Sequence, residues 1–194
     1  MIEENTDCKK AKPEKEYTHL MEFIDNLPYF VMTLLGASVL ILSTRDGTLG
    51  WMLAGSYVLY SFTGAFWIII FVCPYCHFFD TKSCPCGYGQ ISAKIRKVQD
   101  QSRFIEKFKK HIPVIMPLWI IPLVAGIIFL SKNFTFSLFS LVVLFVIDAF
   151  LVLPLLSRKY GCAHCPQKDT CPWMNKEAKL ELKIEQNIQD NRIL

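Results

Sequence analysis

Eight cysteines occur in the 194-residue sequence, and seven of them lie in two short segments. The first segment, "CPYCHFFDTKSCPCGYG" (73–89), contains a C-x2-C pair followed by a C-x-C pair. Each pair can direct two sulfurs at one centre, and the intervening prolines and glycines favour tight turns. The spacing therefore predicts a four-thiolate metal site, with the ligands Cys73, Cys76, Cys84 and Cys86.

The second segment, "GCAHCPQKDTCPW" (161–173), supplies only three sulfurs, from Cys162, Cys165 and Cys171. A tetrahedral site needs a fourth ligand. Either Cys8 in the N-terminal tail or His164 within the motif could provide it. Cys8 would complete a second four-thiolate set, and the choice between the two stays open at this point.

Thiolate tetrahedra suit both zinc and iron–sulfur clusters. Because aromatic residues crowd the first motif, and an apolar shell tunes reduction potential, we favour two [4Fe-4S] clusters. The chain would then be an electron-transfer subunit that links a cytoplasmic redox partner to the membrane or to a quinone-type carrier. The alternative is zinc, since "CPCG" is typical of a zinc-knuckle turn, and it would make the protein a structural membrane scaffold or assembly subunit.

Two redox alternatives use the same cysteines. Cys73 to His77 reads C-P-Y-C-H, the attachment pattern for c-type haem. Cys73 and Cys76 could also be the active pair of a quinone-coupled thiol–disulfide oxidoreductase. The membrane topology derived below opposes both, because haem attachment and stable disulfides belong on the opposite side of the membrane.

The elements that position these cysteines are four apolar blocks. The 52% hydrophobic content exceeds the usual value of about 45–50% for soluble domains. About 20 apolar residues cross the hydrocarbon core as a helix, so four crossings are expected. The first block is the shortest, which leaves a re-entrant segment as its alternative. The blocks cover 29–42, 51–72, 112–130 and 134–156.

All lysines and arginines except Arg45 and Lys132 lie in the tails or in the segment between the second and third blocks. The positive-inside rule places those regions in the cytoplasm. We therefore expect a multi-pass protein of the cytoplasmic membrane with both termini and all eight cysteines on the reducing face, where thiols stay free for metals. The basic loops account for the net charge of +4 through contact with anionic lipid, without nucleic acid.

Asp148 is the acid that interrupts the fourth block, roughly 15 Å along the helix from Arg158. A carboxyl at that depth is either hydrogen-bonded inside the bundle or part of a proton or substrate path. Tyr57, Tyr60, Ser61 and Thr63 on the second span are the expected donors. If quinone chemistry occurs here, Asp148 is the candidate for intramembrane proton handling.

The sequence thus predicts an all-α membrane protein, a four-transmembrane-helix bundle with cysteine-rich metal-binding loops on the cytoplasmic face. The segment "QISAKIRKVQDQSRFIEKFKKH" (90–111) has apolar residues at helical spacing opposite a basic face, which predicts an amphipathic interfacial helix. Other subunits of a membrane complex are expected partners, and an accessory role fits better than a stand-alone enzyme. The predicted regions are an N-terminal tail (1–27), spans one and two (28–72), the four-cysteine loop with its amphipathic helix (73–111), spans three and four (112–157), and the second cysteine motif with a C-terminal helix (158–194).

Overall fold

The computed structural model describes residues 16–44 and 47–162, with side chains described as far as Lys159. These residues form helices and turns and contain no strand. The α-helices are α1 (His19–Leu42), α2 (Gly47–Phe71), α3 (Tyr88–Ile95), α4 (Phe104–His111), α5 (Pro117–Lys132), α6 (Phe136–Ile147) and α7 (Leu153–Leu156). Short 3-10 helices are η1 (Cys73–Tyr75), η2 (Gln101–Arg103) and η3 (Ile112–Val114), and π-helical stretches are η4 (Asp148–Val152) and η5 (Ser157–Cys162).

Four stretches are long and apolar enough to cross a membrane, which confirms the all-helical, multi-pass prediction. The first begins at His19, nine residues before the predicted start of the span, so the shortest apolar block lies within a helix of 24 residues. Polar residues such as Glu22, Asp25 and Asn26 interrupt the apolar ones in its first turns, which is why the sequence alone underestimated its length. The four stretches are His19–Leu42, Gly47–Tyr75, Gln101–Lys132 and Phe136–Lys159.

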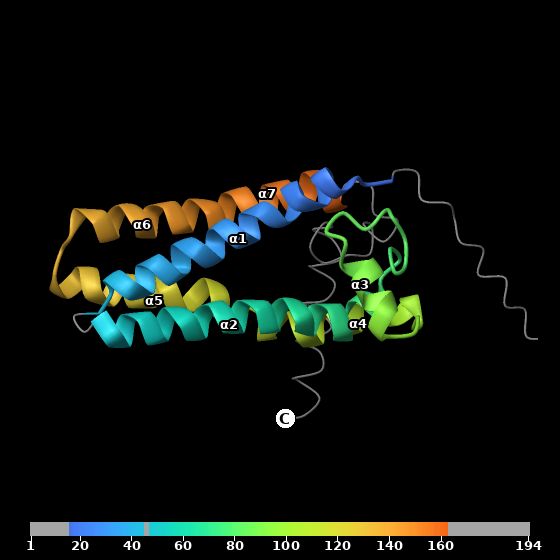
Figure 1. The fold of residues 1–194 in the computed structure, drawn as a ribbon, viewed down its shortest axis with the longest axis horizontal. Coiled ribbons are helices and arrows are strands. Elements are labelled where there is room, and N and C mark those ends of the chain that lie inside the picture. Colours follow the sequence, from blue (N-terminus) through green and yellow to red (C-terminus); the bar gives the residue numbers. More distant parts are fainter. Residues whose placement is uncertain (1–15, 45–46, 163–194) are drawn as a thin grey trace, which may run out of the picture.

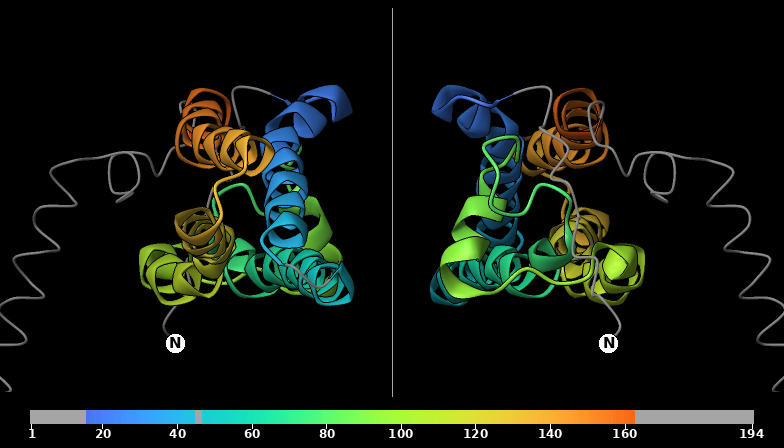
Figure 2. Two further views of the ribbon diagram at one scale, coloured as in Figure 1. Left: turned by 90° about the vertical axis from the view of Figure 1, so that its left-hand side faces the viewer. Right: turned by 90° about the vertical axis from the view of Figure 1, so that its right-hand side faces the viewer.

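The four spans run antiparallel to their chain neighbours in a four-cornered bundle (Figures 1 and 2). α1 is central to the packing, because it contacts α2, α5 and α6. The connections α1–α2 and α5–α6 lie at one end of the bundle (Figure 1). The segment that follows α2, with its four cysteines, lies at the other end beside the start of α1 and the end of the fourth span (Figure 1).

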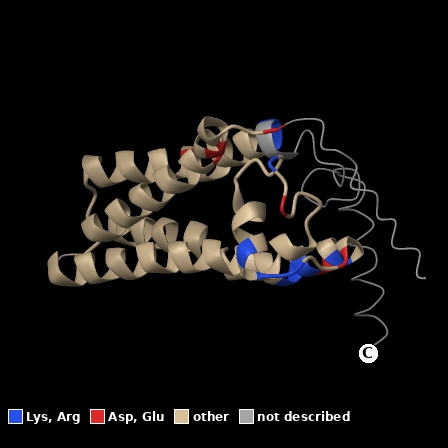
Figure 3. Ribbon diagram, turned by 45° about the vertical axis from the view of Figure 1, so that its right-hand side comes forward, with Lys and Arg blue, Asp and Glu red and all other residues tan. Residues whose placement is uncertain are grey.

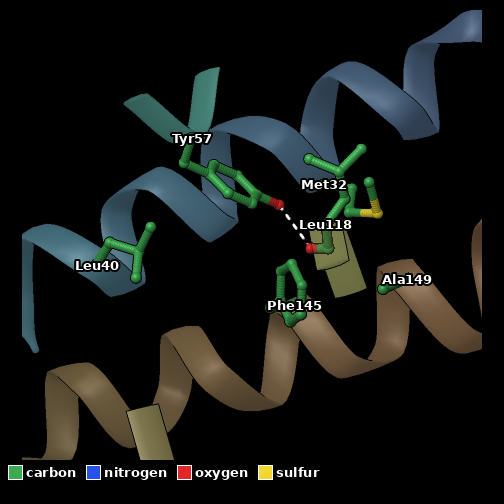
Figure 4. Close-up of a cluster of buried hydrophobic side chains, with 6 residues drawn as sticks. All are labelled: Met32, Leu40, Tyr57, Leu118, Phe145 and Ala149. Atoms are coloured by element: carbon green, nitrogen blue, oxygen red, sulfur yellow. Dashed lines mark hydrogen bonds between the residues drawn. The ribbon is translucent and has the colours of Figure 1, made fainter. Parts of the chain in front are cut away.

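The core lies between α1, α2, α5 and the fourth span, and Figure 4 shows its central cluster. Met32, Leu118 and Phe145 are fully buried there. The Tyr57 hydroxyl crosses the interface and donates a 2.8 Å hydrogen bond to the Leu118 carbonyl oxygen, which Pro122 in α5 leaves without its helical N–H donor. This bond fixes α2 against α5 inside the bundle.

The outer faces of the spans expose large apolar side chains, as expected of helices in lipid. On α2, Leu59 and Phe62 are 69% and 59% exposed. Charged side chains of the described residues gather instead at the end that carries the cysteines (Figure 3), while Lys132 lies in the last turn of α5 at the opposite end. The charge asymmetry predicted from the sequence thus corresponds to the two ends of the bundle.

The predicted amphipathic helix over 90–111 is wrong as a single element. α3 ends at Ile95, because Arg96 adopts an extended conformation, and a non-helical stretch precedes η2 and α4. The Gln99 backbone N–H donates to the Pro74 carbonyl oxygen at 2.9 Å, so this stretch is tied back to the cysteine loop. A contact distant in sequence overrides the local helical pattern here.

Candidate functional site

The cysteine loop, residues 73–89, is built from consecutive tight turns. Cys73 and Cys76 flank η1, and the Cys76 N–H donates to the Cys73 carbonyl oxygen at 3.0 Å. The Gly87 N–H donates in the same way to the Cys84 carbonyl oxygen at 3.2 Å. Each cysteine pair is therefore held in one turn, as its spacing predicted.

The backbone conformation at the end of the cysteine loop requires glycine at two positions. Gly87 has a φ of +73°, a left-handed conformation that disfavours other residues. Gly89 passes so close to the loop that a Cβ there would overlap the Phe78 carbonyl oxygen. This approach lets the Gly89 N–H donate to the Cys84 sulfur at 3.2 Å. Backbone amides aimed at sulfur are the contacts that stabilise and tune thiolate ligands.

The sulfur atoms of Cys84 and Cys86 lie 3.8 Å apart. Cys73 is near enough to interact electrostatically with Cys76 and Cys84, so the two pairs face one region of the loop. All four thiols are free of disulfide bonds. Within the described residues, however, no three His, Cys, Asp or Glu side chains converge closely enough to hold one ion. The Cys84–Cys86 pair is thus in place, and the Cys73–Cys76 pair would have to approach it to complete a site.

The two neighbouring thiols differ in acidity. The hydrogen bond from Cys86, with smaller contributions from backbone N–H groups that include Gly89, lowers the pKa of the Cys84 thiol from 9.0 to about 7. The same hydrogen bond and burial raise the pKa of the Cys86 thiol well above its ordinary value. Cys84 therefore reaches the thiolate form, which binds metals and attacks disulfides, at a lower pH than an ordinary cysteine.

The first turns of α1 hold the loop in place. The Asn26 side-chain amide donates to the Cys86 carbonyl oxygen at 3.1 Å, and the Tyr17 N–H donates to the Lys82 carbonyl oxygen at 2.8 Å. The Glu22 carboxylate lies against Gly87 and accepts from Gln90 at 3.5 Å. The extension of α1 beyond the apolar block thus serves to bind the cysteine loop.

Asp25 is a polar residue at this end that the sequence analysis missed. Its Oδ1 atom is buried without a hydrogen-bond partner among the described residues. Asp25 also interacts electrostatically with Tyr88, which is close enough to interact with Cys86 and Cys73. The available signal was an acid three residues before Pro28, but only the fold brings it near the thiols.

Asp148 begins the π-helical stretch η4 and is 8% exposed. The predicted donors do not serve its buried Oδ2 atom, which lacks a partner within the described part of the chain. Tyr57, Tyr60 and Thr63 instead donate to the carbonyl oxygens of Leu118, Val114 and Leu59, and Ser61 bonds to Tyr29 and Thr33. The prediction of these four donors is therefore wrong, because backbone carbonyls, one of them freed by Pro122, and neighbouring hydroxyls compete for them.

The remaining predicted ligands lie at the edge of the described residues or beyond it. Cys162 is the last residue of η5, at the same end of the bundle as the cysteine loop. Cys8, His164, Cys165 and Cys171 lie outside the described residues. His77, the histidine of the haem-like pattern, has its Nδ1 atom 3.3 Å from the Gln101 side-chain oxygen.

No protein-family model matches this sequence, and neither a characterised protein nor a solved structure shows significant similarity to it.

Proposed function

We propose that this multi-pass membrane protein binds a metal ion through the thiolates of its cysteine loop, and that the bound metal fastens the loop-bearing end of the helix bundle. The ligands would be Cys73, Cys76, Cys84 and Cys86. The observation that carries the proposal is the Cys84–Cys86 pair, 3.8 Å between sulfurs with a backbone N–H directed at one of them.

The separation of this pair bears on the kind of metal centre. Zinc binds sulfur at about 2.3 Å, and two corners of such a tetrahedron are about 3.8 Å apart. The pair therefore supports one metal bound by both sulfurs. In a four-iron cluster each cysteine binds a different iron, which requires wider spacing. We accordingly place zinc first for this loop, ahead of the [4Fe-4S] centres that the sequence favoured.

A metal there would link three elements. Cys73 lies two residues after the end of α2, the second pair precedes α3, and Asn26 holds the turn between Cys84 and Gly87 to α1. Closing the four sulfurs around one ion would fasten these elements together below the membrane. The cytoplasmic position of this end and the role as a scaffold or assembly subunit belong to the same proposal.

Electron transfer is the second candidate. It is favoured by the position of Cys73 within the last residues of the second span and by the buried Phe78, 8% exposed, in the same loop. A redox-active iron centre in the same thiolates would connect a partner subunit to the membrane or to a quinone. The second cysteine set, with Cys8 or His164 as its fourth ligand, would then hold a second centre.

Metal analysis of the full chain, purified in detergent without oxygen, tests both candidates. We expect about one zinc lost per chain when Cys84 is replaced by serine. Ser83→Ala is the matched control, because it alters the neighbouring buried side chain and no sulfur. Iron with acid-labile sulfide would support the electron-transfer candidate. A wild-type protein that binds neither metal would contradict the proposal and favour thiol–disulfide chemistry.

A further inference from the structure

A cavity of about 280 Å³ lies at the end of α2, on the side of the chain where α4 and the extended stretch after α3 meet it. Its walls include Phe71 from α2, Pro74 and Tyr75 from the cysteine loop, and His111 from the end of α4. We refer to it as the basic pocket, because Arg96, Lys97 and Lys107 also line it and none of the acidic residues that the structure describes does.

The cations of the basic pocket are placed by the fold rather than scattered over a loop. The Ser92 hydroxyl donates to the Ile69 carbonyl oxygen at 2.7 Å, and the Gln99 N–H donates to Pro74. Arg96 and Lys97 lie between these two anchors. Their backbone is therefore held against the end of α2. The Arg96 guanidinium lies over the Phe71 ring, 5.8 Å from its centroid.

Two of the three cations lack a carboxylate partner. Neither Arg96 nor Lys97 forms an ion pair with any of the described acidic residues, whereas Lys107 lies 3.6 Å from the neighbouring Glu106. Glu106 is itself 57% exposed and does not line the basic pocket. A concave site with unpaired cations and no internal acid attracts an anion.

The aromatic wall adds a further donor. The Trp67 indole N–H donates to His111 Nδ1 at 3.2 Å, and an indole nitrogen can only donate. Neutral His111 therefore carries its proton on Nε2. The His111 ring stacks on Phe71 with 5.2 Å between centroids, and both residues line the pocket. Guanidinium, ammonium and imidazole N–H groups together are the donors that phosphate oxygens accept from.

An apolar path leads from the membrane to this pocket. Phe62, Phe66 and Ile70 recur every four residues and share one face of α2. Phe62 and Phe66 are exposed on the lipid-facing surface, and Ile70 lines the pocket. A ligand with an acyl chain along this face would bring its headgroup to the cations.

We propose that the basic pocket binds the anionic phosphate group of a ligand at the membrane surface, through Arg96, Lys97 and Lys107. The apolar path on α2 makes an anionic phospholipid headgroup one source of that phosphate, and a free phosphate is the other. The groups that bind phosphate here are not the thiolates, and the pocket wall shares Pro74 and Tyr75 with the cysteine loop.

The test is a titration of the full chain in detergent, read by native mass spectrometry. The probes are short-chain phosphatidylglycerol, short-chain phosphatidylcholine and inorganic phosphate. We expect phosphatidylglycerol to bind at least about tenfold more tightly than phosphatidylcholine, and Arg96→Gln to weaken it by about tenfold. Lys94→Gln is the matched control, since it removes an exposed positive charge from α3 two residues earlier and does not line the pocket.

The two sources of phosphate are separated by competition. Displacement of phosphatidylglycerol by inorganic phosphate identifies free phosphate as sufficient, and the absence of displacement identifies the lipid headgroup. Equal losses in Arg96→Gln and Lys94→Gln, or equal binding of the two lipids, would overturn the proposal in favour of a diffuse basic surface. Lys97→Gln gives the same comparison at an exposed residue if Arg96→Gln does not fold.

Discussion

Between α1 and α2, the hydroxyl groups of Tyr29, Thr33 and Ser61 bond to one another, whereas one turn along α1 the carboxyl oxygen of Asp25 is buried without a partner among the described residues. The hydroxyl groups in the middle of the bundle are paired, and Tyr57 likewise bonds to Leu118, whereas the Asp148 carboxyl keeps one buried oxygen without a partner among the described residues. The cysteine end also holds a buried hydroxyl at Ser83 and free thiols within a few residues.

The paired hydroxyls contribute to helix packing, whereas the buried groups that lack a partner are the candidates for chemistry. A buried polar atom without a hydrogen bond costs about 1–3 kcal/mol, so a stretch that leaves such atoms unpaired is less stable than its sequence could make it. Hydroxyl–carbonyl bonds in the middle of the bundle set the helix positions. The buried acids Asp25 and Asp148 each keep an oxygen without a partner among the described residues, and that oxygen remains available to a ligand or a proton.

The largest effect on stability is expected at Gly89, where the backbone passes close to another part of the cysteine loop. Gly89→Ala places a methyl group against the Phe78 carbonyl oxygen and should lower the free energy of unfolding by about 3 kcal/mol. Gly55→Ala on α2 is the control, because nothing lies within 4 Å of that position. Thermal unfolding in detergent, followed by circular dichroism, measures both. Equal stabilities would show that the loop does not have the tight turn described.

Asp148→Leu should stabilise the protein, whereas Gly89→Ala destabilises it. Removing a buried carboxyl with an unpaired oxygen is expected to raise the free energy of unfolding by about 2 kcal/mol. The conservative change Asp148→Asn retains a polar group to be buried and should gain much less. A clear loss of stability in the leucine variant would mean that Asp148 has a partner in the intact membrane protein.

Tyr57→Phe tests a buried hydroxyl that does have a hydrogen-bond partner. Losing the bond to the Leu118 carbonyl should cost about 1 kcal/mol, near the values measured for hydrogen bonds between membrane helices. Thr63→Val is the matched control, since the Thr63 hydroxyl is exposed and bonds only within its own helix, to Leu59. A Tyr57→Phe protein as stable as the control would remove this bond from the account of α2–α5 packing.

The smallest expected effect comes from the ionisation of a single thiol, that of Cys84. Because the Cys84 pKa is lowered to about 7 from 9.0, the metal-free protein should gain stability as pH rises from about 7 to 9, and lose that contribution as pH falls through 7. Cys86 has a raised pKa and should remain protonated throughout this window. The ultraviolet absorbance of thiolate, compared between the wild type and Cys84→Ser, reports the titration. A midpoint near 9 would contradict the hydrogen bond from Cys86.

The sequence could predict the helical class, the four spans and the grouping of the first four cysteines in turns. Runs of apolar residues near 20 in length have one stable solution in lipid, because each backbone N–H and carbonyl must be satisfied within its own segment. The pairs around Pro74 and Pro85 are similarly local, since the turns that hold them involve only neighbouring residues.

The start of α1 and the break after Ile95 could not be predicted in this way. Asn26 extends α1 past its apolar block by bonding to the cysteine loop, and Gln99 interrupts a helical pattern by bonding to Pro74. In both places the partner is more than 20 residues distant, and no local periodicity encodes it. The same holds for the donors expected at Asp148, which the fold gives to other acceptors.

The amino-acid sequence by itself therefore determined the membrane architecture, the charge asymmetry and which sulfurs share a turn, because these follow from hydropathy, charge and spacing along the chain. Only the tertiary structure decided which polar groups stay unpaired among the described residues, that Asn26 and Gln99 bond to the cysteine loop, and that Arg96, Lys107 and His111 surround one pocket. Those features depend on distances between elements far apart in sequence, which packing alone fixes.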